Sequence, residues 1–578
     1  MSEDRSPDES PLEGSTKKPR SVKKRASSSK PAPKPTTPKP TSTKAGSRPR
    51  PQTAGADDVA PPPAKVPAKP RTRKARPIEA APIEAEPALV VPPALSVMIV
   101  ASEAHPFAKT GGLAEVTAAL SDGLTRLGHS VTLVLPRYRG VDTTGTDRMQ
   151  SRLRLGDRLQ PVTLHEQWIG ERQRVVLVDI PDLFDREALY GTADGDYADN
   201  AWRFAVFSRA ALEYARLKQW RPSIIHAHDW QAGLVPVYQK MQLSGDPHVG
   251  GVPVVFTIHN LAFQGVFPAA TLGTIGLGHE VFDIQAMEFW GNISYLKGGI
   301  NFSEKITTVS PAYAREILSP ELGFGLEGVL RRRSDDLVGI LNGIDTARWT
   351  PANDPFVPAS FTADDLRAKR DAKRALLSTV DLPFDEAALE RPVIGLISRL
   401  TEQKGFDLIA AAMDRLRALD ATWVLLGSGE RRFEDQWRTL AASYPQRMSA
   451  TIGFDERLAH LIEAGADLFL MPSRFEPCGL NQMYSLRYGT VPIVRSTGGL
   501  DDTVTDADAS PDEGTGFKFT DYTPAALVAV IQRALATFAD RARWADIQRR
   551  GMKRDHSWDA SARAYVKLYE SMTAAVLV

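Results

Sequence analysis

Short apolar runs separated by stretches of helical periodicity constrain this chain more than any other feature of its sequence. They form two series, one between residues 96 and 309 and another between residues 393 and 494. Runs of this kind are typical of buried parallel strands, which need a crossover helix to reach the next strand. We therefore predict an α/β fold with two doubly wound, Rossmann-like sheets that face a central cleft, with ligands at the carboxyl ends of the strands.

The expected strands can be given as residue ranges. The first sheet takes residues 96–101, 131–135, 175–180, 224–227, 252–258 and 306–309. The second sheet takes residues 393–398, 423–427, 468–472 and 491–494. A polar stretch with several prolines, residues 345–391, separates the two series.

The first 95 residues differ from the rest in what they can bury. They hold 19 basic and 10 acidic side chains, 20 of the 42 prolines and no aromatic residue. Such a segment cannot offset the entropy of ordering its backbone, so we predict a disordered tail over residues 1–95. Its basic clusters fit a segment that binds nucleic acid or anionic lipid, or a solvated arm, which we favour. The folded part has an acidic balance, which argues against nucleic acid as its partner.

Cysteine usage and hydropathy indicate where the chain resides. Its one cysteine, Cys478, excludes a disulfide within the chain and fits a reducing cytoplasm. The sequence has no run of about 20 apolar residues that would span a membrane. Its acidic first residues are unlike a secretory signal or a transit peptide. We expect a cytoplasmic protein without a membrane segment.

A turn with two glycines follows the first expected strand: Lys109-Thr110-Gly111-Gly112-Leu113. Glycines let a ligand approach the backbone, and free N–H groups at the start of the next helix attract an anion. Lys109 adds a positive charge. The alternative is a plain strand-to-helix turn with an exposed lysine. Neither a P-loop nor a complete dinucleotide-binding fingerprint is present.

Histidines mark the ends of two neighbouring strands. His226 and His228 alternate along one strand, so they share a face, and Asp229 follows them. His259 ends the next strand in the same way. The pattern leaves three interpretations open, namely a metal site, the lining of a ligand pocket and buried structural histidines, and we favour the pocket. A metal site is disfavoured because it needs three or four ligands and no cysteine accompanies the histidines.

Two cationic residues, Arg399 and Lys404, follow a buried strand of the second series. A planar guanidinium and a compact ammonium suit a diphosphate leaving group, whose negative charge grows as its bond breaks. The alternative is a solvated basic turn. We favour the catalytic interpretation.

Glu476 and Cys478 follow the next buried strand, in residues 472–480. Glu476 either caps a helix or faces a sugar. We do not expect Cys478 to be a nucleophile, because no basic partner for it is evident. A second double-glycine turn, Thr497-Gly498-Gly499-Leu500, suits contact with a phosphate or carboxylate. Asp194 and Asp196 resemble a metal-binding pair but lie in a polar loop, so we expect no metal there.

Six segments together resemble the bacterial glycogen synthases, which are relatives of the plant starch synthases. The resemblance covers residues 96–575 and rests on the order and spacing of residues 109–113, 226–230, 259–265, 342–345, 398–405 and 474–482. It implies the GT-B architecture, with domains over residues 96–342 and 343–559. It also implies that a C-terminal helix, residues 560–578, completes the first domain.

The resemblance further implies an activity. Members transfer glucose from ADP-glucose to the non-reducing end of an α-1,4-glucan such as glycogen, with retention and without a metal or cofactor. The residues themselves do not distinguish ADP-glucose from UDP-glucose. A glucan-binding or regulatory protein with little turnover is one alternative. Another GT-B sugar-nucleotide transferase is a second.

Roles follow from the matched segments. Arg399 and Lys404 stabilise the departing ADP, while His259 and Glu476 orient the glucose. Substrate contacts come from Lys109, Gly111, Gly112, Asp229, Asn342, Cys478, Gly479, Leu480, Gly498 and Gly499. Two positions depart from the family: Glu115 stands where Asp is usual, and Tyr484 stands where related retaining enzymes often have a second Glu. We therefore expect same-face attack rather than a covalent double displacement.

Overall fold

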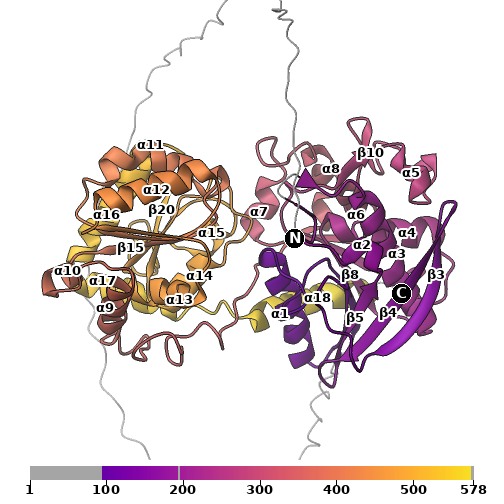
Figure 1. Cartoon of the computed structure of the whole chain (residues 1–578), viewed down its shortest axis with the longest axis horizontal. Helices are drawn as coiled ribbons and strands as arrows, with labels where there is room; N and C mark the ends of the chain where they lie inside the picture. The colour runs from indigo at the N-terminus through magenta and orange to yellow at the C-terminus, as the bar shows by residue number, and fades with distance from the viewer. Residues whose placement is uncertain (1–93, 193–194, 575–578) are drawn as a thin grey trace, which may run out of the picture. The chain divides into compact units, whose positions relative to one another are not determined.

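The computed structural model describes residues 94–192 and 195–574 (Figure 1). Nearly all of the tail predicted for residues 1–95 lies outside these residues, and so do Asp194 and residues 575–578. Within the described residues, no helix is both long and apolar enough to cross a membrane.

The first sheet has nine strands and contains all the strands predicted between residues 96 and 309. Its order is β14 (Leu337–Gly339), β13 (Lys305–Thr308), β9 (Val254–Ile258), β8 (Ile224–His228), β1 (Ser96–Val100), β2 (Ser130–Pro136), β5 (Gln173–Asp179), β4 (Arg158–Trp168) and β3 (Asp147–Leu155). Neighbours from β14 to β5 are parallel, with Val97 opposite Val131 and Ile224. The strands β3 and β4 are antiparallel additions at one edge.

The second sheet has six strands, all parallel. Its order is β17 (Met448–Ile452), β16 (Thr422–Gly427), β15 (Val393–Ile397), β18 (Leu468–Met471), β19 (Val491–Arg495) and β20 (Phe517–Phe519). Helices cover both faces of it, with α11 and α12 on one side and α13 and α14 on the other (Figure 1). The prediction of two doubly wound sheets is confirmed.

The helices connect the strands as parallel topology requires. Around the first sheet they are α1 (Gly112–Arg126), α2 (Pro181–Phe184), α3 (Asn200–Leu217), α4 (Leu234–Gln242), α5 (Thr271–Thr274), α6 (Tyr295–Phe302), α7 (Pro311–Glu316) and α8 (Glu327–Arg332). Around the second they are α11 (Phe406–Leu416), α12 (Arg431–Ser443), α13 (Glu456–Gly465), α14 (Asn481–Arg487), α15 (Gly498–Thr503), α16 (Pro524–Ala539) and α17 (Arg541–Met552).

Several elements were not predicted. The hairpin of β3 and β4 has mostly polar, exposed side chains, so it carries no buried apolar run. The edge strands β14, β17 and β20 are short or only half buried. The polar stretch, residues 345–391, contains two helices, α9 (Lys369–Thr379) and α10 (Glu386–Glu390). Two small sheets add β10 (Val266–Pro268), β11 (Glu288–Phe289), β12 (Asn292–Ser294), β6 (Gly191–Thr192) and β7 (Gly195–Asp196).

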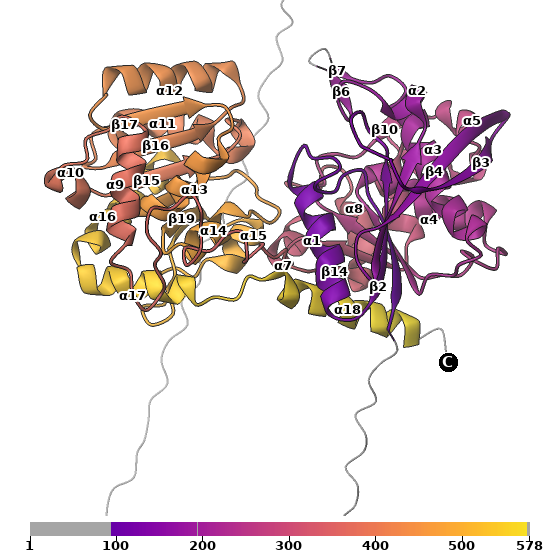
Figure 2. The same cartoon turned by 60° about the horizontal axis from the view of Figure 1, so that its bottom comes forward.

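The last described helix, α18 (Trp558–Ala574), packs against α1 of the first sheet (Figure 2). Tyr565 and Tyr569 are fully buried in the core of that sheet. The Ser561 hydroxyl donates to the carbonyl of Leu341 (2.6 Å), and Arg126 pairs with Asp559 (2.7 Å). The proposed boundaries at residues 342/343 and 559/560 stay predictions.

Candidate active site

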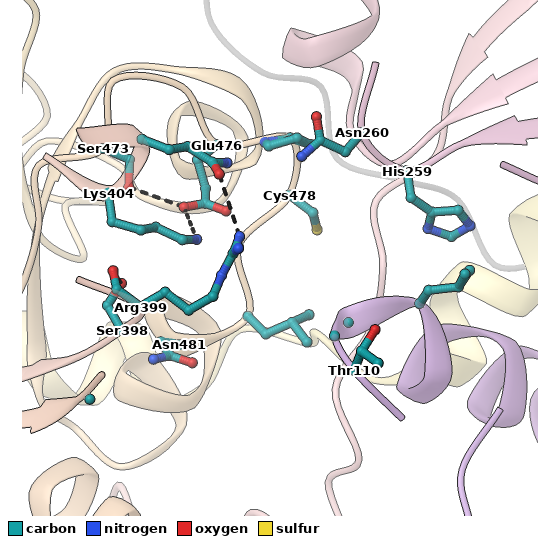
Figure 3. A pocket seen from close by; sticks show the side chains of 18 of the residues that line it. Thr110, His259, Asn260, Ser398, Arg399, Lys404, Ser473, Glu476, Cys478 and Asn481 are labelled. Atoms are coloured by element: carbon teal, nitrogen blue, oxygen red, sulfur yellow. Dashed lines mark hydrogen bonds and ion pairs between the residues drawn. The ribbon is translucent and has the colours of Figure 1, made fainter. Parts of the chain in front are cut away.

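A cavity of about 720 Å³ lies at the carboxyl ends of strands from both sheets (Figure 3). It is lined by most of the residues that the sequence singled out, namely Gly111, Gly112, Asp229, His259, Asn342, Arg399, Lys404, Glu476, Cys478, Gly479 and Leu480. Three others, Lys109, Gly498 and Gly499, do not line it. The structure therefore brings together residues that are up to about 370 positions apart in the chain.

The first double-glycine turn opens directly onto this cavity. A methyl group on Gly111 or Gly112 would meet no protein atom within 4 Å. The turn is held from behind by Glu103, whose carboxylate accepts the Thr110 backbone N–H (2.5 Å) and hydroxyl (2.7 Å). The Tyr190 hydroxyl donates to the same carboxylate (2.5 Å). Glu103 is buried and lines the cavity, and the sequence analysis missed it.

Lys109 lies outside the cavity because another partner takes its charge. Its Nζ atom is 2.6 Å from Oε1 of Glu115, and the Lys109 side chain is 45% exposed. Glu115 itself lines the cavity. The contact of Lys109 with a donor phosphate therefore stays a prediction, and it requires the ammonium to leave Glu115.

The histidines at the ends of β8 and β9 are buried and mutually bonded. His226 bonds the hydroxyls of Thr257 (2.6 Å) and Tyr569 (2.7 Å), while Nδ1 of His228 is 2.9 Å from Nε2 of His259. Burial lowers the pKa of His226 and His259 to about 3 and that of His228 well below its usual value, so all three rings are neutral. Only His259 lines the cavity, so the favoured pocket interpretation fails for His226 and His228.

Two patterns in the sequence were considered for a metal, His226 with His228 and Asp194 with Asp196. Within residues 94–192 and 195–574, no group of three or more His, Cys, Asp or Glu side chains is placed to hold a metal ion. Asp196 lines the cavity as an exposed residue of β7, and Asp194 lies outside the described residues.

Asp229 and Asn342 present polar groups from the first sheet to the cavity. Asp229 adopts a left-handed backbone conformation (φ 55°), which is costly for a non-glycine residue and is common at functional sites. Its Oδ1 atom accepts the backbone N–H of His259 (2.8 Å), and burial raises the pKa of its carboxyl to about 7. The buried Oδ1 atom of Asn342 has no hydrogen-bond partner among the described residues. Such an acceptor suits a ligand hydroxyl.

The cationic residues of the second sheet enter the cavity from the turn after β15. The side chain of Arg399 is exposed and makes one long hydrogen bond, to Oε1 of Gln403 (3.4 Å). It has no ion pair within the described part of the chain. Lys404 is different, because its Nζ atom is 2.6 Å from Oε2 of Glu476 (Figure 3). Arg399 is thus a cation with most of its donors unused.

One glycine explains how Lys404 reaches Glu476. Gly405 follows Lys404 with φ 83°, and a methyl group there would lie 2.2 Å from the carbonyl oxygen of Pro472. Only glycine allows the turn after β15 to approach the turn after β18 this closely. The carboxylate of Glu476 also accepts the Ser473 hydroxyl (3.0 Å), and the residue as a whole is 5% exposed.

Cys478 lies in the same loop and is buried. Burial raises the pKa of its thiol to about 12, so the sulfur is protonated and not nucleophilic. This agrees with the expectation that Cys478 lines the site without attacking a substrate.

The second double-glycine turn is hydrogen-bonded within the protein in this structure, and its contact with a ligand stays a prediction. The Gly498 N–H donates to Oε1 of Glu316 (2.9 Å), and the Gly499 N–H donates to the carbonyl of Glu476 (3.1 Å). A methyl group on either glycine would lie 2.0 Å from a backbone carbonyl oxygen, that of Glu476 or Cys478. In this structure both amides already have protein partners and lie behind the Glu476 loop.

Comparisons with known proteins agree with this geometry. A family model for the starch synthase catalytic domain matches residues 96–332, and one for glycosyl transferases group 1 matches residues 381–550. A glycogen synthase of Anaeromyxobacter dehalogenans is 50% identical over 480 residues, which are 83% of this chain and 99% of the relative. The chain belongs to the glycogen synthase family.

Further relatives of the glycogen synthase family support the assignment. The glycogen synthase of Koribacter versatilis is 46% identical over 82% of this chain and 98% of its own length. The catalytic domain of starch synthase IV from Arabidopsis thaliana, solved with ADP and acarbose, is 35% identical, with a TM-score of 0.75 over 83% of this chain and all of that one. The fold is therefore GT-B. The chain is a glycosyltransferase that elongates glycogen with a nucleotide-sugar donor and a glucan acceptor.

Proposed function

We propose that this enzyme transfers glucose from ADP-glucose to the 4-hydroxyl at the non-reducing end of an α-1,4-glucan, with retention of configuration and release of ADP. The similarity to a starch synthase solved with ADP and acarbose supports the choice of donor and acceptor. The proposal places the enzyme in the cytoplasm, as its single cysteine suggests.

The observation that carries the proposal is the state of the two cations. Arg399 faces the cavity with most of its donors unused, and Lys404 lies in the same cavity beside Glu476. As the bond between the glucose anomeric carbon and the diphosphate breaks, negative charge grows on the diphosphate oxygens. Cations already in place stabilise that charge without reorganisation, which is usually the largest catalytic contribution.

The surroundings of Glu476 favour attack on the same face that the diphosphate leaves. Its carboxylate is neutralised by Lys404 and bonded to Ser473, so it orients glucose rather than attacking it. Tyr484, eight residues later, is stacked on Trp349 with a centroid distance of 4.1 Å and offers no second carboxylate. The acceptor oxygen bonds to the anomeric carbon as the diphosphate oxygen leaves, and that oxygen takes the acceptor's proton.

Residues of the first sheet hold the sugar in this proposal. His259 and Asn342 are neutral hydrogen-bonding groups at the cavity wall, and Asp229 fixes the His259 backbone. The open amides of Gly111 and Gly112 contact the donor, and Lys109 reaches its phosphate after leaving Glu115. The Cys478, Gly479 and Leu480 segment lines the opposite wall.

The test is glucose incorporation from ADP-glucose into glycogen by the purified full chain. We expect Arg399→Ala and Lys404→Ala each to lower kcat about 100-fold or more. Arg431→Ala is the matched control, because this arginine is 92% exposed on α12 outside the cavity. Activity that survives both cavity substitutions would remove the leaving-group argument.

Two further arms define the reaction. UDP-glucose in the same assay tests donor choice, and we expect much slower transfer than with ADP-glucose. Digestion of the product by an exo-acting enzyme specific for α-1,4 linkages tests retention. Glucan binding without transfer would instead support the regulatory alternative.

A further inference from the structure

Two short helices, one beside each sheet, are hydrogen-bonded to one another, and no residue of either lines the cavity. These are α7, after β13, and α15, after β19 (Figures 1 and 2). The Ala312 N–H of α7 donates to Oδ2 of Asp502 in α15 (2.7 Å). In return, Glu316 of α7 accepts the Gly498 N–H (2.9 Å) and the Thr497 hydroxyl (3.0 Å). Each helix thus supplies a carboxylate to the other.

The turn bonded to Glu316 also contacts the backbone of residues 472–480, the loop that carries Glu476. The Gly499 N–H donates to the carbonyls of Glu476 (3.1 Å) and Pro477 (3.2 Å). Gly498 packs so closely against the Glu476 carbonyl that residues 497–499 cannot shift without moving the backbone at Glu476. A continuous series of contacts therefore runs from Glu316 through residues 497–499 to Glu476, whose carboxylate meets Lys404.

Glu316 has defined hydrogen-bond partners, unlike an acid that points into solvent. It is half-buried, and burial raises the pKa of its carboxyl, while the hydrogen bonds from Gly498 and Thr497 and the charge of Arg495 lower that pKa. Asp501 and Asp502 are the nearby acids on α15, and Arg315 lies 3.9 Å from Asp502. A carboxylate partly removed from water in this way is stabilised by these donors and loses that stabilisation if they move.

We propose that Glu316 is a positioning residue for glucosyl transfer: through Thr497, Gly498 and Gly499 it fixes where Glu476 stands relative to Lys404 and Arg399. The inference rests on the proposed function for its kinetic consequence. A purely structural contact would stabilise the protein without a selective effect on turnover. A positioning contact affects the transfer step more than donor binding, because small misplacements at the reacting centre are costly.

The experiment compares Glu316→Ala, Glu316→Gln and Thr497→Val with a control, Glu321→Gln. Glu321 is an exposed acid in the loop after α7, with no bond to another described residue. Initial rates with ADP-glucose and glycogen give kcat and KM, and thermal unfolding gives the midpoint. We expect Glu316→Ala to lower kcat about tenfold with KM for ADP-glucose changed less than about twofold. Glu316→Gln restores part of kcat, because its amide oxygen still accepts one hydrogen bond.

Three results would overturn the proposal. The first is wild-type kcat in Glu316→Gln and Thr497→Val, which also decide the matter if Glu316→Ala does not fold. The second is a parallel change of kcat, KM and unfolding midpoint in those two variants. The third comes from amide hydrogen exchange in residues 473–482. The proposal predicts faster exchange there in Glu316→Gln than in Glu321→Gln. Equal exchange rates in the two variants would contradict the contact series, and this readout does not depend on activity. A wild-type protein that transferred no glucose would refute the proposed function instead.

Discussion

The two double-glycine turns of this chain have nearly the same sequence and opposite surroundings. The first, at Gly111 and Gly112, has open space where side chains would stand and lines the cavity. The second, at Gly498 and Gly499, is in contact with the carbonyl oxygens of Glu476 and Cys478 and its amides are bonded within the protein. One turn leaves room for a ligand and the other leaves room for backbone.

The difference shows that a pair of glycines indicates that another group comes close to the backbone, but not whether that group is a ligand or part of the protein. In the first turn no protein atom lies within 4 Å of where a side chain would begin, so a ligand has room to approach the backbone. In the second turn a carboxylate, Glu316, occupies the place at the helix start that an anionic ligand would take. Substitutions at matched positions therefore separate binding from packing.

The largest effect is expected for Gly499→Ala. Its methyl group would lie 2.0 Å from the carbonyl oxygen of Cys478, and backbone on both sides must shift to relieve the clash. We expect the free energy of unfolding to fall by about 3 kcal/mol, as measured by urea denaturation. A stability within about 0.5 kcal/mol of wild type would show that the two turns are not distinguished by packing.

Gly111→Ala is expected to affect catalysis and leave stability unchanged. A methyl group here enters the cavity rather than the protein, so kcat/KM for ADP-glucose falls about tenfold. The free energy of unfolding stays within about 0.5 kcal/mol. Gly170→Ala is the matched control, since it also has open space around it but lies in an exposed loop away from the cavity. Equal kinetics for the two variants would contradict ligand contact at the first turn.

Asp229→Asn tests how the free energy of unfolding depends on pH through one buried carboxyl at the end of β8. Burial, together with the nearby Glu103, raises the pKa of Asp229 to about 7 in the folded protein, whereas an unfolded Asp titrates near 3.8. The folded state therefore holds the proton between pH 4 and 7 and the unfolded state does not. Wild-type stability then falls as pH rises through this window and levels above it.

The variant lacks this titration and still accepts the His259 N–H through its amide oxygen. We expect its stability relative to wild type to improve by about 2 kcal/mol between pH 5 and 7, in urea denaturation at a series of pH values. If the free energies of unfolding of the two proteins changed in parallel with pH, Asp229 would already be ionised at pH 5.

The smallest effect is expected for Glu115→Gln at the first turn. It releases Lys109 from an exposed ion pair, and such pairs contribute less than about 1 kcal/mol. Stability should change by less than about 0.5 kcal/mol, while KM for ADP-glucose falls about twofold at low salt because the ammonium is free. Glu171→Gln, at an exposed acid outside the cavity, is the control. A raised KM would indicate that Glu115 itself contacts the donor.

The features predictable from sequence were those that depend on local pattern. Apolar runs located the central strands of both sheets, since strands buried on both faces have little choice of composition. Most of the charged and glycine residues singled out directly after those runs do line the cavity, because carboxyl ends of parallel strands meet at one edge.

The features that sequence could not predict depend on distant partners. The pairing of Lys109 with Glu115 and of Gly498 with Glu316 requires the folded arrangement, so neither turn alone indicates whether its cation or amides are available. Glu103 carried a signal, as an acid three residues after the first strand, whereas Tyr190 lies in a loop without one. The hairpin of β3 and β4 was not predicted because its polar, exposed side chains resemble those of a loop.

The most direct test of the account is a crystal structure of the full chain with ADP bound. The account predicts nitrogen atoms of Arg399 and Lys404 within about 3.2 Å of the diphosphate oxygens, with Gly111 and Gly112 facing the same ligand. ADP bound elsewhere, or bound in the cavity while both cations point into bulk solvent, would contradict the claim that these two side chains neutralise the leaving nucleotide.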